Sequence, residues 1–325
     1  MSTADQTPLG SGFGASSTAA DVVAGLDLTG RLAVVTGGYS GLGLEAVRAL
    51  TGAGAHCVVP ARRVDAAREA LEGIEGPDGD SPEVDELDLS DLESVAAFAE
   101  RFLASDRSID MMIDNAGIMA TPETRVGPGW EAQFATNHLG HFALVNRLWP
   151  ALARDGGARV VSVSSRGHHR APVILDDLEF ESGYDKWEAY GRSKSANVLF
   201  AVELAALGRD QGVRAFALHP GGIMTPLQRH LPHDEMVALG WIDEDGTIIN
   251  TSFKSPEQGA ATEVWAATSP RLEGRGGLYL EDCDVAEVAT EAGSSGVRPY
   301  ALDTDAAAAL WTLSVERTGV DAFAA

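Results

Sequence analysis

The chain has 325 residues, of which 45% are hydrophobic, and its formal net charge is −24. This length and composition suit one large globular α/β domain. The negative charge excludes nonspecific binding to nucleic acid or to an anionic membrane surface, because both need a basic patch that displaces counterions. The acidic residues are spread over loops and helix faces, so we interpret them as solubility determinants.

No apolar run approaches the roughly 18 residues of a transmembrane helix, and the first residues lack the basic region and apolar core of a secretory signal. We therefore expect no membrane span and a cytoplasmic location. Cys57 and Cys283 have no metal-ligand or CxxC spacing, which predicts buried free thiols. His138 and His141 lack a third ligand, so helix packing is expected there and no metal site.

Residues 1–17 are small and polar, and they predict a flexible N-terminal arm. Residues 18–325 are expected to form one domain. From Arg31 onward, short β-branched runs alternate with helical patterns, and this predicts a doubly wound parallel sheet with helices on both faces, a Rossmann-type α/β fold. The expected strands lie in RLAVVT, HCVVPA, VDELDL, IDMMIDNAG, ARVVSVSS, VRAFALHPGG and GGLYL.

Gly37, Gly41 and Gly43 follow the first expected strand and lead into a helix. Backbone N–H groups and the positive end of the helix dipole then point at whatever lies above the turn, and a phosphate is the natural guest. The spacing G-x-x-x-G-x-G differs from the G-x-G-x-x-G dinucleotide fingerprint. On this motif alone, glycines that serve only a tight turn and close packing are the alternative.

Further motifs follow in a fixed order: TGGYSGLG at 36–43, DNAG at 114–117, NHLGH at 137–141, VSVSS ending at Ser165, YGRSK at 190–194 and HPGG at 219–222. In this order the chain resembles the short-chain dehydrogenase/reductase family. Within that family it is most similar to the retinol-dehydrogenase and WW-domain-oxidoreductase-like branch. The resemblance extends over approximately residues 18–320.

Transfer of a hydride between a nicotinamide and an alcohol carbon needs a positioned acid/base for the alcohol proton. Tyr190 is the candidate, and Lys194 lies on the same helical face, where its charge is expected to lower the tyrosine pKa from roughly 10. Ser165 is expected to hold the substrate oxygen, with Ser164 as the alternative. The resemblance implies that Asn137 supports a water that relays protons through Lys194.

Cofactor choice is expected to depend on the end of the second strand. At the position where an NAD enzyme has a carboxylate, the chain has Ala61, followed by Arg62 and Arg63. An arginine offers a charge-assisted fork for a 2′-phosphate, so NADP(H) is favoured and NAD(H) is the alternative. Solvated loop arginines are the other interpretation. With the resemblance, the expected cofactor-binding residues are Gly37, Tyr39, Ser40, Gly41, Leu42, Gly43, Arg62, Asp88, Leu89, Asn115, Ala116, Gly117, Tyr190, Lys194, Pro220, Gly221, Ile223 and Thr225.

Residues about 222–254 form an unusually long connection, and we expect a substrate lid there. Arg229, His230, Asp234 and Glu235 are expected on its outward polar face, and completion of the core or an oligomer contact is the alternative. An apolar lid favours a small hydrophobic substrate of the steroid, retinoid or aryl type. Its apolar residues, at spacings of short amphipathic helices, are Leu227, Leu231, Met236, Val237, Leu239 and Trp241.

The sequence thus predicts an NADP(H)-dependent oxidoreductase that interconverts a hydrophobic secondary alcohol and a ketone or aldehyde. Two other classes are kept as alternatives: a nucleotide-sensing or scaffold protein without turnover, and an NAD(H)-dependent epimerase or lyase on the same fold. The resemblance implies a homodimer or homotetramer, paired through the helix with Tyr190 and the helix after Ser255. His168 and His169 are expected either to line the substrate pocket or to form an ordinary loop.

Overall fold

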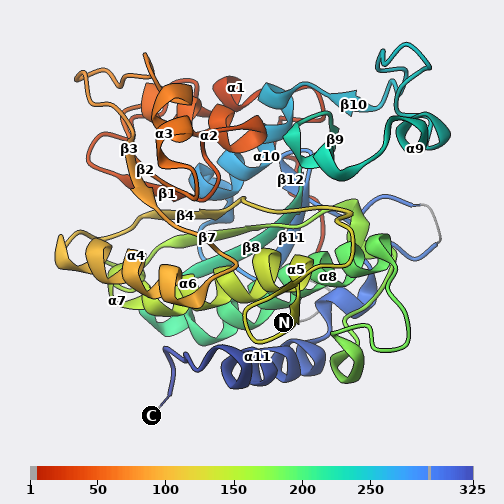
Figure 1. Cartoon of the computed structure of the whole chain (residues 1–325). Helices are drawn as coiled ribbons and strands as arrows, with labels where there is room; N and C mark the ends of the chain where they lie inside the picture. The colour runs from red at the N-terminus through yellow and green to blue at the C-terminus, as the bar shows by residue number, and fades with distance from the viewer. Residues whose placement is uncertain (1–5, 292–293, 325) are drawn as a thin grey trace.

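The computed structural model describes residues 6–291 and 294–324. Residues 1–5, the start of the expected arm, lie outside these ranges. An eight-stranded sheet of order β12-β11-β8-β7-β4-β1-β2-β3 forms the centre (Figure 1). All neighbours are parallel except β11 and β12. The strands are β1 (Leu32–Val35), β2 (His56–Ala61), β3 (Glu83–Glu86), β4 (Met111–Asp114), β7 (Arg159–Val163), β8 (Arg214–His219), β11 (Leu278–Glu281) and β12 (Asp284–Val285).

All the expected strands are confirmed, and helices cover both faces of the sheet (Figure 1). On one face lie α1 (Ala19–Val23), α2 (Gly41–Gly52), α3 (Val64–Ala70) and α10 (Pro256–Thr268). On the other face lie α4 (Leu92–Ala104), α6 (Gly140–Arg147), α7 (Trp149–Leu152), α8 (Lys186–Leu207) and α11 (Thr304–Thr318). The doubly wound Rossmann-type fold is therefore confirmed. Because the chain runs from β1 outward to β3 and then crosses back to β4, the carboxyl ends of β1 and β4 form the switch point where such sheets bind ligands.

Short elements connect these layers. Most of them lie near the carboxyl ends of the strands, where they surround the candidate site. They are β5 (Arg125–Val126), β6 (Trp130–Glu131), α5 (Ala132–Phe134), η2 (Ala135–Leu139), η3 (Arg166–His169), η4 (Leu175–Asp177), η5 (Arg209–Gln211), β9 (Gly222–Ile223), η6 (Pro226–His230), α9 (His233–Ala238), β10 (Phe253–Lys254), η7 (Pro270–Leu272) and η8 (Pro299–Leu302).

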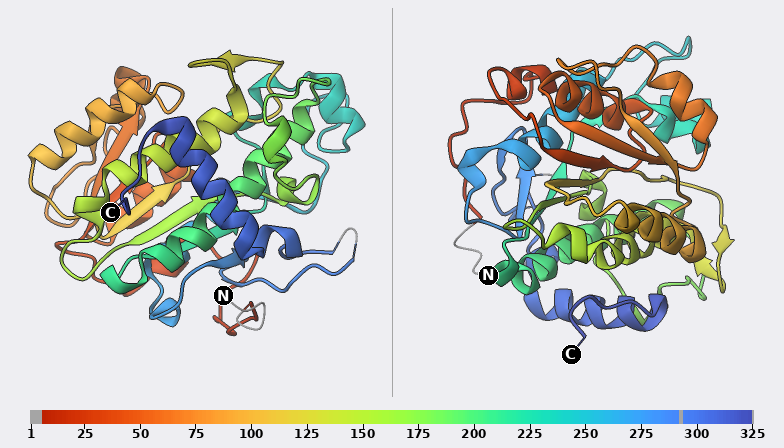
Figure 2. Two further views of the ribbon diagram at one scale, coloured as in Figure 1. Left: turned by 90° about the horizontal axis from the view of Figure 1, so that it is seen from below. Right: turned by 90° about the vertical axis from the view of Figure 1, so that its left-hand side faces the viewer.

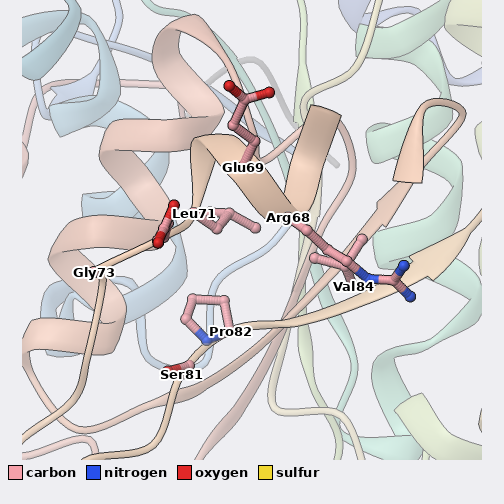
Figure 3. A pocket seen from close by; sticks show the side chains of 8 residues that line it. Arg68, Glu69, Leu71, Gly73, Ser81, Pro82 and Val84 are labelled. Atoms are coloured by element: carbon pink, nitrogen blue, oxygen red, sulfur yellow. The ribbon is translucent and has the colours of Figure 1, made fainter. Parts of the chain in front are cut away.

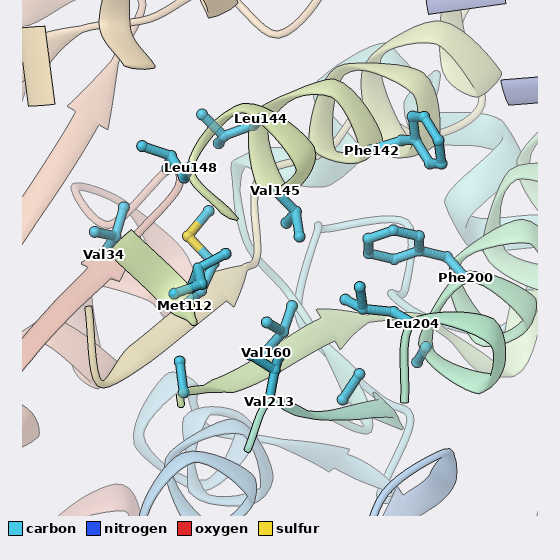
Figure 4. Close-up of a cluster of buried hydrophobic side chains, with 14 of the residues drawn as sticks. Val34, Met112, Phe142, Leu144, Val145, Leu148, Val160, Phe200, Leu204 and Val213 are labelled. Carbon is cyan, nitrogen blue, oxygen red and sulfur yellow. The ribbon is translucent and has the colours of Figure 1, made fainter. Parts of the chain in front are cut away.

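The sheet separates two apolar cores because alternate strand residues point to opposite faces. Val34 and Met112 pack with α4, α6 and α8, whereas Ala33 and Ile113 pack with α2 and α10. Figure 4 shows Phe142 and Phe200 facing each other in the first core, with ring centroids 6.0 Å apart. Burial of each such large apolar side chain stabilises the fold by about 1.5–3 kcal/mol, which fixes the helices that present the site.

The N-terminal arm departs from the expected flexible one. Gln6 is buried, and its side-chain amide donates to the carbonyls of Tyr279 (2.6 Å) and Ala286 (2.7 Å). The N–H groups of residues 9–11 donate to the Asp284 carboxylate. Small polar residues therefore do not make this arm loose, because long-range hydrogen bonds fasten it to β11 and β12.

The helices that the resemblance implied for oligomer pairing are covered within the chain. Every residue of α8 from Ala189 to Val202 is buried, as is every residue of α10 from Gly259 to Ala267. Helix α11 packs across α8, as Figure 2 shows from below, and α1 packs on α10. Pairing through these two helices would require α11 and α1 to move. Among the described helices, none combines the length and apolar character that a bilayer crossing requires.

Candidate active site

The glycine turn between β1 and α2 packs directly on the end of β4. Gly37 has a φ of +66°, which favours glycine. A Cβ on Gly43 would lie 2.5 Å from the Asn115 amide nitrogen and 2.8 Å from the Gly37 carbonyl oxygen. Asn115 in turn donates to the Thr36 carbonyl (2.8 Å). The turn and the DNAG segment therefore form one tightly packed unit.

The same turn leaves a helix N-terminus open. Ser40 is the N-cap of α2, and its side chain makes no capping hydrogen bond. The first N–H groups of α2 thus point beyond the turn with the positive end of the helix dipole. A Cβ on Gly41 would lie 3.3 Å from Thr225, so the glycine lets the start of α2 lie close to the start of η6. A dinucleotide pyrophosphate fits this arrangement of donors.

Other expected cofactor residues meet on α10. A Cβ on Gly259 would lie 2.4 Å from Leu42 and 2.8 Å from Ile223, so both side chains lie against this helix. Gly221 packs on the alkyl chain of Lys254. Segments on either side of the predicted nicotinamide position are thus brought together. The remaining expected residues are also placed: Tyr39 is half-buried against the α2 and α10 core, Leu89 and Pro220 are buried, and Thr225 caps η6.

Three arginines approach one another near the end of β2. Arg62 is 66% exposed, and its nearest carboxylate, Asp88, lies 4.0 Å away. Burial lowers the pKa of Arg229, and the charges of Arg62 and Arg63 lower it further. Arg229 comes from η6, a segment expected to present it outward. In a chain of charge −24, this local positive charge is suited to an anion.

Tyr190 and Ser165 come together at the carboxyl end of β7. Tyr190 is buried on α8, and its phenol hydrogen-bonds with the Ser165 side chain. Ser164, the alternative, instead donates its hydroxyl proton to the Lys194 carbonyl (2.7 Å). Alternation along the strand explains the difference, since Ser164 points into the packing beneath α8 and Ser165 points to the open edge.

The electrostatics of the pair differ from the expectation. Burial raises the pKa of Tyr190 to about 12, and the Ser165 hydrogen bond opposes this rise. Burial also lowers the pKa of Lys194 to about 7. The Lys194 ammonium lies 5.8 Å from the Tyr190 ring centroid and donates to the Val163 carbonyl (2.8 Å). Lysine charge alone therefore does not lower the tyrosine pKa, because removal of both groups from water outweighs their attraction.

Asn137 lies in the π-helical turn η2, where its side chain is fully bonded. It accepts from the Ile118 N–H (2.9 Å) and donates to the Ile118 carbonyl and the Ser193 hydroxyl (both 3.0 Å). A Cβ on Gly117 would lie 3.1 Å from the Asn137 carbonyl-type oxygen Oδ1 and 3.7 Å from the Lys194 nitrogen. The glycine therefore leaves Asn137 and Lys194 facing a shared space.

His141 joins this turn to the glycine turn. Its Nδ1 lies 3.1 Å from the Asn137 carbonyl oxygen and its Nε2 lies 2.9 Å from the Thr36 hydroxyl, which also accepts from the Ala116 N–H (3.0 Å). His138 instead bonds to Ser314. Both histidines therefore serve packing. Within residues 6–291 and 294–324, no cluster of His, Cys, Asp or Glu could hold a metal ion.

Residues of the expected lid pack on the Tyr190 side chain. Short helices η6 and α9 form, and one apolar cluster contains Leu231 with Tyr190 and the adjoining Leu227, Met236 and Trp241. Two residues expected in this apolar stripe lie outside the cluster: Leu239 is 37% exposed and Val237 is half-buried elsewhere. The helices in this segment, η6 and α9, are too short to carry a continuous apolar stripe. The helical spacing in the sequence therefore identifies only some of the residues on the apolar face.

Glu235 was expected on the outward face, and this prediction is wrong. Its carboxylate accepts from the Lys186 ammonium (2.5 Å) and from the Trp187 indole N–H (2.9 Å). These partners lie at the start of α8, and Trp187 contacts Trp241 edge-on at 6.1 Å. The ion pair and the indole hydrogen bond turn the partly exposed carboxylate toward α8, and they fasten α9 to the helix that carries Tyr190.

Sequence reasoning missed three further contributors to this apolar wall. Met119 and Ala120, just after the DNAG motif, are buried against Tyr190, and Trp187 packs beside them. The position of Trp187, three residues before Tyr190 on one helix, is the spacing that places both on one face. Trp187 could therefore have been predicted from the helical spacing, whereas no local pattern in the sequence indicates a contact of Met119 or Ala120 with Tyr190.

A separate hollow of about 520 Å³ lies between α3 and the edge strand β3 (Figure 3). Arg68, Glu69, Ser81 and Val84 are among the residues that line it. It contains none of the residues that converge at the carboxyl ends of the strands, and its mixed charges are those of an ordinary surface. We therefore place the candidate site at Tyr190.

Comparisons with known proteins agree with this geometry. The model of the short chain dehydrogenase family matches residues 31–236. A probable oxidoreductase of Streptomyces lividans is 44% identical over 291 residues, which cover 88% of this chain and 97% of that protein. Human retinol dehydrogenase 12 is 35% identical over 296 residues, covering 91% of this chain and 88% of that protein. A solved but uncharacterized protein of Mycobacterium paratuberculosis has a TM-score of 0.70 and 33% identity, covering 94% of this chain and 98% of that one.

The family match spans most of the sheet and the edge where Ser165 and Tyr190 lie, from β1 to α9. Relatives with oxidoreductase names align over nearly the whole chain. A nicotinamide dinucleotide is accordingly the cofactor. The chain belongs to the short-chain dehydrogenase/reductase family and is an NAD(P)-dependent oxidoreductase that acts on CH–OH groups.

Proposed function

We propose that this protein uses NADP(H) to interconvert a hydrophobic alcohol and the corresponding ketone or aldehyde, of the steroid, retinoid or aryl type. One observation carries the proposal. The Tyr190 phenol hydrogen-bonds to Ser165, lies beside Lys194, and is packed in an apolar cluster beneath residues 226–241. This arrangement supports a role for Tyr190 as proton donor to an apolar substrate.

The residues divide the proton chemistry among them. The bound nicotinamide supplies or accepts the hydride. In the direction of reduction, the carbonyl carbon gains the hydride, the π electron pair moves to oxygen, and that oxygen takes the phenolic proton of Tyr190. The Ser165 hydroxyl hydrogen-bonds to the same oxygen and orients it. The reverse direction returns the proton to Tyr190.

Lys194 and Asn137 support the tyrosine. As the phenolate forms, the nearby ammonium offsets its charge, and this offset is largest in a site that excludes water. Lys194 then passes a proton toward Tyr190 through the space that it shares with Asn137 beside Gly117. Because the Asn137 side chain is already fully bonded, its role is to hold the walls of this space.

The preference for NADP(H) is supported by charge at the end of β2. A 2′-phosphate there would meet Arg62 and Arg63, with Arg229 approaching from η6. Asp88 is 4.0 Å from Arg62, too far for a firm ion pair that would occupy the guanidinium. The substrate class is supported by the lid, whose apolar side chains face Tyr190 while Glu235 fastens it to α8.

The first prediction concerns Tyr190→Phe. We expect turnover to fall by about 10²–10⁴-fold or more, because the variant loses the proton donor. The dissociation constant of the cofactor, measured by fluorescence titration, should stay within a few-fold. By comparison, Lys194→Ala should lose both turnover and cofactor affinity. A Tyr190→Phe variant with near-normal turnover would remove Tyr190 from the mechanism.

The second prediction concerns cofactor choice. The double variant Ala61→Asp with Arg62→Ala should shift the ratio of kcat/KM from NADP(H) toward NAD(H), because it removes a cation from the 2′-phosphate and adds a repelling carboxylate. Arg229→Gln should raise the KM for NADPH and leave that for NADH unchanged. A wild-type preference for NAD(H) contradicts the assignment of these arginines.

The third prediction concerns the lid. Leu231→Ser or Trp241→Ser should lower kcat/KM for large apolar ketones by about tenfold or more, because burial of apolar surface is worth about 25 cal/mol per Å². Leu239→Ser is the matched control, since Leu239 is 37% exposed and lies outside the cluster. A panel of carbonyl compounds of increasing size gives the measurement. Equal efficiency for small polar and large apolar compounds would show that the lid does not select the substrate.

A further inference from the structure

The chain turns at residues 165–167, where β7 leads into η3, and we call this segment the serine turn. A histidine directly after this turn is completely buried. His168 is 0% exposed and belongs to the 3-10 helix η3, for which Ser165 is the N-cap. Its Nδ1 lies 2.7 Å from the Ser165 carbonyl oxygen, and its Nε2 accepts from the Arg298 N–H at 3.1 Å. Both ring nitrogens are therefore used, and the ring is hidden from the substrate enclosure.

These two partners fix which nitrogen carries the proton. A backbone N–H can only donate, so Nε2 must hold a lone pair, and a carbonyl can only accept, so Nδ1 must carry the hydrogen. Burial lowers the pKa of His168 to about 4, and the ring is neutral at neutral pH. The ring thus links the Ser165 carbonyl to the backbone of Arg298 in one orientation.

The serine turn is packed tightly on the phenol. The Ser165 hydroxyl accepts from the Gly167 N–H at 3.0 Å and hydrogen-bonds with Tyr190. A Cβ on Gly167 would lie 2.7 Å from the Tyr190 ring atom Cε1. A shift of the turn by a few tenths of an ångström would therefore change the Ser165 and Tyr190 geometry directly.

On its other side, His168 is held by the C-terminal part of the chain. The Tyr300 hydroxyl donates to the His168 carbonyl. The Ser195 hydroxyl lies 3.2 Å from the same carbonyl oxygen and donates to the Ala171 carbonyl at 2.6 Å. The ring also packs on Tyr279 of β11, with ring centroids 5.0 Å apart. Arg298 and Tyr300 belong to a segment outside the matched family region of residues 31–236, so this support comes from beyond the part that defines the family.

We propose that His168 is a positioning residue: its Nδ1–H holds the Ser165 carbonyl and so fixes the Ser165 hydroxyl on the oxygen that Tyr190 protonates. The Tyr300 hydroxyl, on the His168 carbonyl, and the Arg298 N–H, on Nε2, keep the histidine in place. It does not touch the substrate or transfer a proton. This inference rests on the proposed function, since it needs Ser165 to act in turnover.

Two variants of similar size separate this role from simple packing. In His168→Asn, the amide nitrogen takes the place of Nδ1 and retains the bond to Ser165. In His168→Gln, the amide oxygen takes the place of Nε2 and retains the bond to Arg298 only. We expect kcat for ketone reduction by NADPH to stay within about threefold in the Asn variant and to fall about tenfold in the Gln variant, a loss of one hydrogen bond. The dissociation constant of NADPH should be unchanged in both.

Leu152→Ala is the control for destabilisation alone, because Leu152 is buried in α7 and belongs to the core between the sheet and α6, not to the cluster around Tyr190. It should lower the unfolding temperature and leave kcat unchanged at an assay temperature below that transition. If the His168 variants fail to fold, Tyr300→Phe, which loses only the hydroxyl that bonds to the His168 carbonyl, should lower kcat about threefold at unchanged NADPH affinity.

The positioning role is overturned if kcat is equal in the Asn and Gln variants. If Tyr300→Phe is the variant used, an unchanged kcat overturns it. In both cases the proposed function stands. A wild-type protein that reduces no carbonyl compound overturns both. A ¹⁵N NMR spectrum of the histidine-labelled protein provides a readout apart from activity.

The His168 signals are assigned as those that disappear in His168→Asn, and they should show the Nδ1–H tautomer. The Nε2–H tautomer for His168 would contradict the hydrogen-bond assignment.

Discussion

Burial of the Lys194 ammonium is the constraint around which the site is organised. A charged amine removed from water must find acceptors or lose its proton. Here the ammonium donates to the Val163 carbonyl, and burial lowers its pKa to about 7. The same burial raises the pKa of Tyr190 to about 12. In the free protein the Tyr190 phenol therefore keeps its proton, which is the form that the proposed proton donor needs.

The sheet edge provides this environment through close backbone approach. Missing side chains at Gly43 and Gly117 let the glycine turn, the DNAG segment and the η2 turn pack within hydrogen-bond distance of one another. Thr36 and His141 then join these segments in a continuous chain of hydrogen bonds. A larger residue at either glycine would push these segments apart. The fold and the proposed catalysis thus depend on the same few contacts.

Local patterns in the sequence predicted the fold and most of the residues that converge at the site. Short strand-like runs identified every strand of the central sheet except β12. The order of motifs indicated that Ser165, Tyr190 and Lys194 meet at one edge. Features that depend on distant partners were not predictable in this way. Glu235 turns toward α8 because Lys186 and Trp187 provide hydrogen-bond donors there. The raised pKa of Tyr190 depends on its burial by segments that are distant in the sequence. The hydrogen bond from Gln6 to β11 could not be predicted either, because the residues around Gln6 are small and polar and carry no pattern that indicates burial.

The central claim is that this chain transfers a hydride to a bulky apolar carbonyl carbon while Tyr190 supplies the proton. The most direct test uses NADPH deuterated at the transferable position and an aryl or steroid ketone, with the product analysed by mass spectrometry and NMR. The account predicts one deuterium at the carbinol carbon, a primary isotope effect on single-turnover reduction, and loss of the signal in Tyr190→Phe. Cofactor binding without deuterium transfer to any apolar ketone would contradict it.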